Sequence, residues 1–408
     1  MSFYDVLQRG DDFIREYRPA RSKLWNYVSH LTCLAAVGGS KLCLTLFYDV
    51  QVKGLANLDK GLAMARKQNR GFLTIMNHMS VCDDPFLWGC LPWRYFMDLD
   101  DIRWGLAASN VCFKTEAAST FFTLGKILST ERFGRGPFQG ALDAAVRILS
   151  PDDTLDEKHI YQGSSSSKKV MTTSASPLGS SLVEHAKSFY STTYTPPFLR
   201  YKTSWIHLFP EGYVCQLQAP YNNSMRFFRW GTARLILEPT VAPVIVPIFS
   251  DGFEKIVPET RDDSLVGSYA PPNMGATITV NIGKAIDDSV IESFREEWKK
   301  LCDRFHDVTN PDDLTHELKF GQEARELRSR VCAYLREKVA QLRVENGFEE
   351  EDPRFKSVDF WKKYTYSQGA SDPDIKFVGL NWAVKSYQKG VHKYDEFGNI
   401  IQHASTNK

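Results

Sequence analysis

Short apolar runs alternate with helical segments along most of this chain, and this alternation restricts its fold more than any other feature. Four of the runs have the length and composition of β-strands, and Ile102–Ala108 is a fifth candidate. Strands that alternate with helices are typical of sheets with helical crossovers. The sequence therefore predicts an α/β fold with a mostly parallel or mixed central sheet flanked by helices. The four runs are Phe72–Met76, Trp205–Phe209, Val244–Phe249 and Thr277–Ile282.

Helical periodicity and one Ser-rich interruption divide the chain into three parts. Residues 151–200 are rich in Ser, Thr and Pro and are interpreted as a flexible insertion. The predicted helices cover Leu55–Gln68, 116–130, 139–149, Ser289–Asp307 and Gln322–Asn346. We expect a membrane-associated segment at 1–50, an α/β domain at 51–285 that carries the insertion, and C-terminal helices with a polar tail at 286–408.

Residues 25–48 form the most apolar window of the chain. A helix that spans a bilayer needs about 20 apolar residues, but Lys41 interrupts this window, and a Lys near the centre of such a helix costs roughly 2.5–3.5 kcal/mol. A helix or hairpin that dips into one leaflet therefore fits better than a full span. It places Trp25, Leu34, Leu42 and Phe47 in contact with lipid. The alternative is a buried core helix.

Charge and cysteine content narrow the class of protein further. The chain has 50 Lys and Arg against 49 Asp and Glu, a net charge of +1, so no nucleic-acid partner is expected. The 8 cysteines show neither CxxC spacing nor a Cys/His cluster, and no metal is expected. Asp5, Asp11, Asp12 and Glu16 argue against an N-terminal transit peptide, so an organelle address is expected to be internal.

The first candidate for chemistry is the sequence from Asn77 to Asp83, directly after the apolar run Phe72–Met76. In open α/β sheets, sites form at the carboxyl ends of strands. His78 and Asp83 are separated by a turn into a helix that Asp83 and Pro85 are expected to cap and open. The carboxylate can then orient the imidazole as a general base. The alternative is a structural His–Asp hydrogen bond.

A second candidate, Phe209–Gly212, also follows an apolar run. If both strands belong to one parallel sheet, Glu211 and His78 emerge at the same edge. Glu211 can then bind a substrate hydroxyl or fix the His78 loop, with Gly212 beside it. Because Pro-x-Gly is also turn chemistry, a simple tight turn is the alternative.

Two arginine-containing segments are further candidates. Arg132 follows an apolar segment and can form a phosphate fork. The alternative, a surface salt bridge, is favoured when this segment is considered alone. In residues 213–230, Arg226 and Arg229 alternate with the rings of Phe227, Phe228 and Trp230, a pattern that suits a lipid headgroup boundary. The alternative is an amphipathic stretch packed on the core.

Taken together, four blocks in order resemble the glycerophospholipid acyltransferase superfamily, and within it the tafazzin family, its fungal members in particular. The resemblance covers nearly the whole chain and is weakest in the Ser-rich insertion and after about residue 385. The sequence departs from the superfamily at one point: Tyr213–Cys215 stands where acyl-CoA-dependent members have Thr-Arg-Ser. An arginine that binds phosphate must therefore come from elsewhere in the chain. Arg132 and Arg229 are the candidates. The four blocks are His78 with Asp83, Gly125 to Arg132, Phe209–Gly212 and Val244–Phe249.

The resemblance implies a mitochondrial transacylase that moves an acyl chain from a phospholipid such as phosphatidylcholine to monolysocardiolipin or another lysophospholipid, and so remodels cardiolipin. It implies no cofactor and no metal. The enzyme is expected to sit on the outer and inner membranes facing the intermembrane space, inserted without crossing; oligomers or protein complexes stay open. His78 and Asp83 are the expected catalytic residues, and Asn77, Arg132, Glu211, Gly212 and Arg229 the expected substrate-binding ones.

Two other functions compete with this one. An acyl-CoA-dependent lysophospholipid acyltransferase shares the pair of His78 and Asp83, so that motif does not discriminate. A non-enzymatic lipid-binding module explains the aromatic content, 13% of residues, and the apolar window 25–48. It does not require His78, Asp83 and Glu211 at strand ends.

Overall fold

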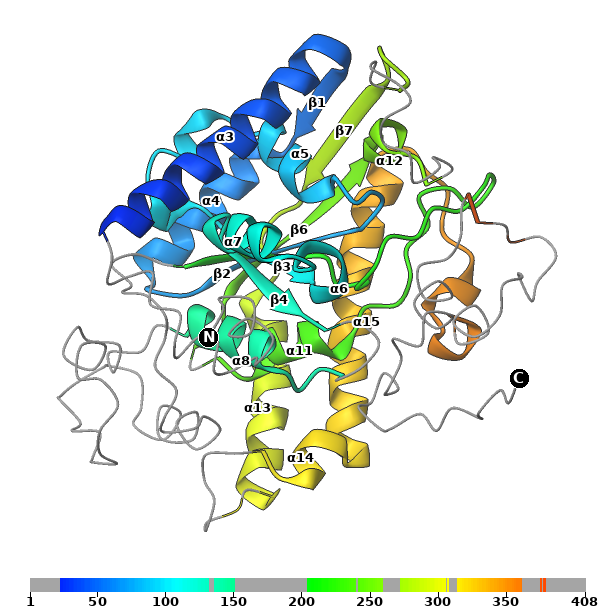
Figure 1. The fold of residues 1–408 in the computed structure, drawn as a ribbon. Coiled ribbons are helices and arrows are strands. Elements are labelled where there is room, and N and C mark those ends of the chain that lie inside the picture. The colour runs from blue at the N-terminus through cyan, green and yellow to red at the C-terminus, as the bar shows by residue number, and fades with distance from the viewer. Residues whose placement is uncertain are drawn as a thin grey trace, which may run out of the picture.

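A seven-stranded mixed sheet forms the centre of the molecule in the computed structural model (Figure 1). The strand order is β1-β7-β6-β2-β5-β3-β4, and every neighbouring pair is parallel except β6 with β7. This confirms the predicted α/β fold. The strands are β1 Asp49–Lys53, β2 Phe72–Met76, β3 Trp104–Ala108, β4 Ile127–Thr130, β5 Trp205–Leu208, β6 Val244–Asp251 and β7 Thr277–Ile282. The structure describes residues 23–131, 136–150, 204–239, 241–259, 272–305, 307, 314–361, 375 and 377–378.

Helices cover both faces of the sheet, and β2 is therefore buried on both sides. Leu73 and Ile75 point into a core shared with α8, α11, α13 and α15, while Phe72 and Met76 point into a second core shared with α3, α4 and α5. The larger helices are α3 Lys23–Phe47, α4 Leu55–Lys67, α5 Asp83–Cys90, α7 Glu116–Leu124, α8 Gly140–Leu149, α11 Trp230–Leu237, α13 Asp288–Phe305 and α15 Gln322–Glu345. The short ones are η2 Trp93–Tyr95, η3 Leu99–Asp101, α6 Ser109–Cys112, α12 Phe253–Ile256, α14 His316–Phe320 and η5 Pro353–Lys356.

The apolar N-terminal window forms one continuous helix, α3, and not a hairpin. It packs along α5, where Gly89 leaves room for Ser40. Lys41 turns into this contact, and its Nζ donates to the carbonyl oxygens of Gly89 and Leu91 at 2.8 Å each, at the carboxyl end of α5. The charge expected to oppose a full membrane span is therefore bound by backbone carbonyl groups of the protein itself.

The exposed side of α3 is apolar. Leu42 is 61% exposed, whereas Leu34 and Phe47 are half-buried against the neighbouring core. The side chain of Trp25 lies outside the described residues. The stretch Asn26–Phe47, with mean hydropathy 1.4, is the one helix in the described part of the chain that is long and apolar enough to cross a membrane, judged by length and composition.

Three local expectations differ from the structure. Residues 116–130 are not one helix: α7 ends at Leu124, and Lys126, with a φ of 59°, turns the chain into β4. β1, at the sheet edge, was not predicted. Asp83 does not cap α5, because its carboxylate turns back to the preceding loop and leaves Cys82 as the N-cap without a side-chain bond. The predicted insertion, 151–200, and most of the predicted tail lie outside the described residues.

Candidate active site

The site lies where three neighbouring parallel strands end. β2 pairs with β5 on one side and β6 on the other, so their carboxyl ends meet at one edge of the sheet. Asn77, the first residue after β2, is fully buried, and its side-chain amide exchanges two hydrogen bonds with the backbone of Ser250 in β6, at 2.8 and 2.9 Å. Asn77 does not line the cavity. The amide therefore ties two strand ends together, and the predicted role of Asn77 in substrate binding stays a prediction.

His78 and Asp83 come together as the sequence predicts. Nδ1 of His78 lies 2.8 Å from Oδ2 of Asp83. The same oxygen accepts the backbone N–H groups of Met79 at 2.7 Å and Ser80 at 3.0 Å. One carboxylate oxygen thus fixes both the imidazole and the loop that carries it. Because Asp83 holds Nδ1, Nε2 is the ring nitrogen left for a substrate.

The two members of this pair differ in burial. Asp83 is fully buried, whereas the side chain of His78 keeps 17% of its surface exposed. Burial raises the pKa of Asp83 above its ordinary value, and the hydrogen bonds from His78, Ser80 and Met79 oppose that rise by stabilising the carboxylate. If His78 becomes protonated, its positive charge interacts with a carboxylate that little water can reach, and this electrostatic attraction is therefore only weakly screened.

Glu211 acts as a clamp on the His78 loop. Its Oε1 accepts the backbone N–H of His78 and its Oε2 accepts that of Arg226, both at 2.8 Å, and its side chain is fully buried. Burial raises the pKa of Glu211 to about 7, against the hydrogen bonds that favour its charged form. Of the two roles predicted for Glu211, fixing the His78 loop is the one its contacts support.

Replacing Glu211 by Gln tests this clamp. An amide offers one acceptor oxygen, so one of the two backbone N–H groups would face the NH₂ group of Gln and lose its partner. We expect the Glu211→Gln variant to lose about 1–3 kcal/mol of stability and a large part of its acyl-transfer activity, measured by thermal unfolding and by turnover.

Glu254→Gln is the matched control for this change. Glu254 is half-buried, its pKa is also raised to about 7, and its side chain also accepts backbone N–H groups, those of Gly252 and of Glu254 itself. These donors belong to α12 and its N-cap, and not to the loop that carries His78. Equal losses in the two variants would contradict the clamp.

Gly212 and Arg229 are coupled. Gly212 has a φ of 81°, and a β-carbon there would lie 2.5 Å from Nε of Arg229. That nitrogen donates to the carbonyl oxygen of Glu211 at 3.2 Å. Both residues line the cavity, so the small size of Gly212 lets Arg229 lie against the loop that holds His78. Phe209 stacks on the His78 ring, with centroids 4.4 Å apart.

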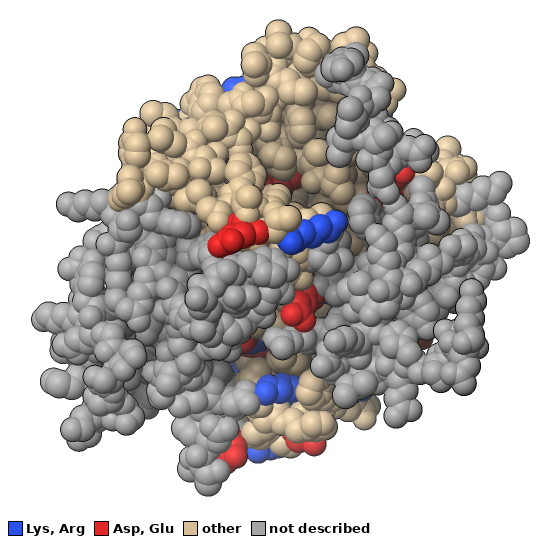
Figure 2. Space-filling view, viewed as in Figure 1, with Lys and Arg blue, Asp and Glu red and all other residues tan. Residues whose placement is uncertain are grey.

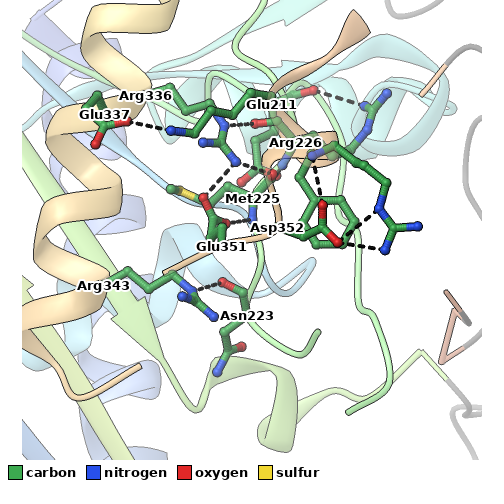
Figure 3. Close-up of polar contacts among 12 residues, drawn as sticks. Glu211, Asn223, Met225, Arg226, Arg336, Glu337, Arg343, Glu351 and Asp352 are labelled. Atoms are coloured by element: carbon green, nitrogen blue, oxygen red, sulfur yellow. Dashed lines mark hydrogen bonds and ion pairs between the residues drawn. The ribbon is translucent and has the colours of Figure 1, made fainter. Parts of the chain in front are cut away.

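A buried network behind Glu211 was not predicted from the sequence (Figure 3). Arg336 of α15 donates to the carbonyl oxygens of Arg226 and Met225, at 2.9 and 2.7 Å, and pairs with Glu351 at 2.7 Å. Glu351 in turn accepts the backbone N–H of Met225. The segment that Glu211 grips is therefore held from its other side by residues more than 100 positions later, a contact for which the sequence pattern offers no signal.

A cavity of about 1100 Å³ adjoins the pair, with His78 on its wall. Most of its lining is apolar, and α3, α5, β3 and α7 all contribute to it. Arg229 and Arg336 line it from the α11 and α15 side, and Arg103 lines it from the strand side. Its size exceeds the roughly 300–1,000 Å³ of typical small-molecule sites. In the described part of the chain, no cluster of His, Cys, Asp and Glu could hold a metal ion.

The other predicted residues are distributed as follows. Arg132 lies outside the described residues. Phe228 is 3% exposed and belongs to the core, which corrects its prediction as a membrane contact. Phe227 is half-buried against the cluster around Phe355, and Trp230 donates its indole N–H to Ser329 of α15 at 3.0 Å. These rings pack on the protein's own C-terminal part.

A His–Asp pair lies at the carboxyl edge of an α/β sheet, on the wall of a large apolar cavity, and this arrangement is consistent with an acyltransferase. The Acyltransferase family model matches residues 49–251.

Relatives narrow this class further. Tafazzin of Saccharomyces cerevisiae is 47% identical over 390 residues, 95% of this chain and 97% of that protein. Taffazin of Dictyostelium discoideum is 27% identical over 61% of this chain and 67% of its own length, and N-acylphosphatidylethanolamine synthase of Arabidopsis thaliana is 26% identical over 57% and 64%. The chain belongs to the tafazzin family, and it is a phospholipid acyltransferase.

Proposed function

We propose that the protein is a CoA-independent transacylase that moves an acyl chain from a phospholipid such as phosphatidylcholine to monolysocardiolipin or another lysophospholipid, and so remodels cardiolipin. One observation carries the chemistry: Asp83 holds Nδ1 of His78 at 2.8 Å on the wall of the apolar cavity. This arrangement leaves Nε2 to act as a base on a substrate in that cavity.

In the proposed reaction, the lysolipid hydroxyl oxygen attacks the acyl carbonyl carbon of the donor. Nε2 of His78 takes the hydroxyl proton, and Asp83 stabilises the imidazolium. The ester bond to the donor glycerol then breaks, and His78 returns the proton to the leaving oxygen. An ester is consumed and an ester is formed, so direction follows lipid supply. The apolar lining excludes water, which would otherwise hydrolyse the donor.

Independence from CoA is supported by the family and by the residues after Gly212. Tyr213, Val214 and Cys215 are at most 3% exposed, so the segment at which acyl-CoA-dependent members carry Thr-Arg-Ser presents no phosphate ligand. Arg229, half-buried on the cavity wall, is the described arginine that we propose for a phosphate.

The deciding experiment uses purified protein with labelled phosphatidylcholine and monolysocardiolipin in vesicles without CoA. Appearance of the label in cardiolipin supports the transacylase. Transfer that strictly requires added acyl-CoA supports instead the acyl-CoA-dependent lysophospholipid acyltransferase, whose His–Asp pair is the same.

We further propose that the protein inserts into one leaflet of mitochondrial membranes facing the intermembrane space, through α3. The exposed residues of α3 whose side chains are described carry no charge, and Figure 2 shows the surface around this helix as largely free of charged groups. Because α3 also packs along α5, it suits a position in the membrane interface rather than a span.

Replacing two exposed leucines of α3 tests this insertion. Leu31 and Leu42 are 46% and 61% exposed, and each leucine loses about 1.5–3 kcal/mol of burial energy when it no longer enters lipid. We expect the Leu31→Gln, Leu42→Gln double variant to bind neutral phosphatidylcholine vesicles at least about tenfold more weakly in a flotation assay.

The control changes two exposed apolar residues elsewhere, Met274→Gln and Val344→Gln, which are 58% and 46% exposed. This control variant should bind the vesicles like the wild-type protein. Unchanged binding of the α3 variant would rule out insertion through that face.

A further inference from the structure

The cavity that contains His78 reaches the apolar outer surface of the protein. Its exposed lining residues include three apolar ones: Ala36 of α3, Phe121 of α7 and Val81 of the loop between His78 and Asp83. Because α3 packs against both α7 and α5, the helix that follows the catalytic loop, these residues place an exposed apolar part of the cavity lining between α3, α7 and that loop. We call this the α3–α7 opening.

The two sides of the α3–α7 opening are fixed to one another. The hydroxyl of Ser29 in α3 donates to the carbonyl oxygen of Leu124 at the end of α7, at 2.6 Å. On the other flank of α3, Nε2 of His30 lies 2.8 Å from the carbonyl oxygen of Phe96. The helix therefore keeps its place beside the opening, and the opening is part of the folded structure.

The surface around the α3–α7 opening is apolar. Most of the large exposed apolar side chains of the described chain lie on α3 and the segments beside it. Beyond the opening, Trp93 and Met97 are 44% and 67% exposed, and the ring of Trp93 packs over Gly38 of α3. An aqueous entrance would carry polar groups at its rim, whereas this rim continues the face that we propose to lie in lipid.

The remote part of the same cavity has the opposite character. There the lining residues include Arg325 and Glu337 of α15 and, further on, Lys356 and Asp359, all of them exposed. The cavity thus offers mainly apolar walls toward α3, where the charged lining residues Asp84 and Arg103 pair with each other, and exposed charged groups toward α15. An amphipathic substrate matches this division, with its chain toward α3 and its headgroup toward α15.

We propose that the α3–α7 opening is a lateral portal, through which an acyl chain of a bilayer phospholipid passes from the leaflet into the cavity without crossing water. This inference rests on the proposed function and adds the route of the substrate. Exposing a long acyl chain to water is unfavourable in proportion to its length. A portal that continues the membrane face avoids that exposure, and an entrance from the charged side does not.

Two adjacent alanines of α3 give a matched test. Ala35 and Ala36 are both exposed, but Ala36 lines the cavity and Ala35 does not. We expect Ala36→Trp to lower transfer between long-chain lipids in vesicles at least about tenfold by filling the portal. Ala35→Trp, which adds the same ring to the same helix, should stay within about twofold of wild type. Vesicle flotation should show equal membrane binding of both variants.

A reversible block guards against a folding defect. Ala36→Cys and Ala35→Cys are purified folded and then modified with a bulky methanethiosulfonate reagent, with treated wild type as the reference for the native cysteines. Modification should inhibit Ala36→Cys alone, and a reducing agent should restore it. Equal effects at the two positions, or none at position 36, overturn the portal. If the wild-type protein itself transfers no acyl chain without CoA, the proposed function fails, and the portal is then scored on the acyl-CoA-dependent reaction.

Discussion

We expect the His78→Ala variant to transfer acyl chains at least about 10²-fold more slowly than the wild-type protein. Without the imidazole, the variant lacks the base that would accept the proton of the lysolipid hydroxyl. Asp83 cannot replace it, because its carboxylate is fully buried behind His78. The removed ring is part-exposed and its backbone stays bound to Glu211, so the fold should persist. Turnover in the CoA-free vesicle assay is the measurement.

His316→Ala is a suitable control, because His316 lies on α14 with 80% of its side chain exposed. Both variants should retain wild-type helical content and membrane binding. Turnover of a folded His78→Ala protein within a few-fold of wild type would falsify the role of His78 as the base. Full biological function without His78 would favour the non-enzymatic lipid-binding module.

The second large effect is expected for Asp83→Asn. An amide oxygen can take the place of Oδ2 and still accept the N–H groups of Met79 and Ser80, so the loop should keep its shape. In this orientation the negative charge that stabilises the imidazolium is lost. In the opposite orientation the NH₂ group takes the place of Oδ2 and faces Nδ1, which would select the wrong tautomer of His78. In a catalytic triad the equivalent change costs about 10⁴-fold in turnover, and we expect a loss of about 10²- to 10⁴-fold here.

The measurement should separate turnover from binding. We expect kcat to fall while KM for the donor lipid changes little, because Asp83 is fully buried and does not line the cavity. Asp101→Asn, which removes one carboxylate of a peripheral pair with Arg66, provides the control. A variant at Asp83 with normal kcat would reduce the pair to a structural hydrogen bond.

Continuous apolar runs made the centre of the sheet predictable. β2, β5 and β6 are buried along nearly their whole length, and such strands are visible in the sequence because both faces need apolar residues. Once they were placed in one parallel sheet, the meeting of His78, Asp83 and Glu211 at its carboxyl edge followed. The alternation at β1, five residues at the edge, was too short to stand out.

Other features depended on contacts between distant residues. β4 consists of only four residues, two apolar and two with hydroxyl groups, and it follows a helix closely. Periodicity alone does not distinguish such a short run from a continuation of that helix. The hydrogen bond from the backbone N–H of Arg226 to Glu211 depends on tertiary packing and could not be predicted from the sequence pattern. The burial of Phe228 was also hidden, since aromatic rings beside arginines suit both a lipid boundary and a core.

Arg336 and Glu351 hydrogen-bond to the backbone of the segment next to Glu211, and these contacts have a consequence for biosynthesis. All motif residues of the family have been translated once the ribosome passes β6, yet the segment at Met225 and Arg226 then lacks its partners from α15 and beyond. A nascent chain of that length contains every catalytic group without the support that aligns them. The enzyme is therefore expected to become competent only late in synthesis, after residue 351 has emerged.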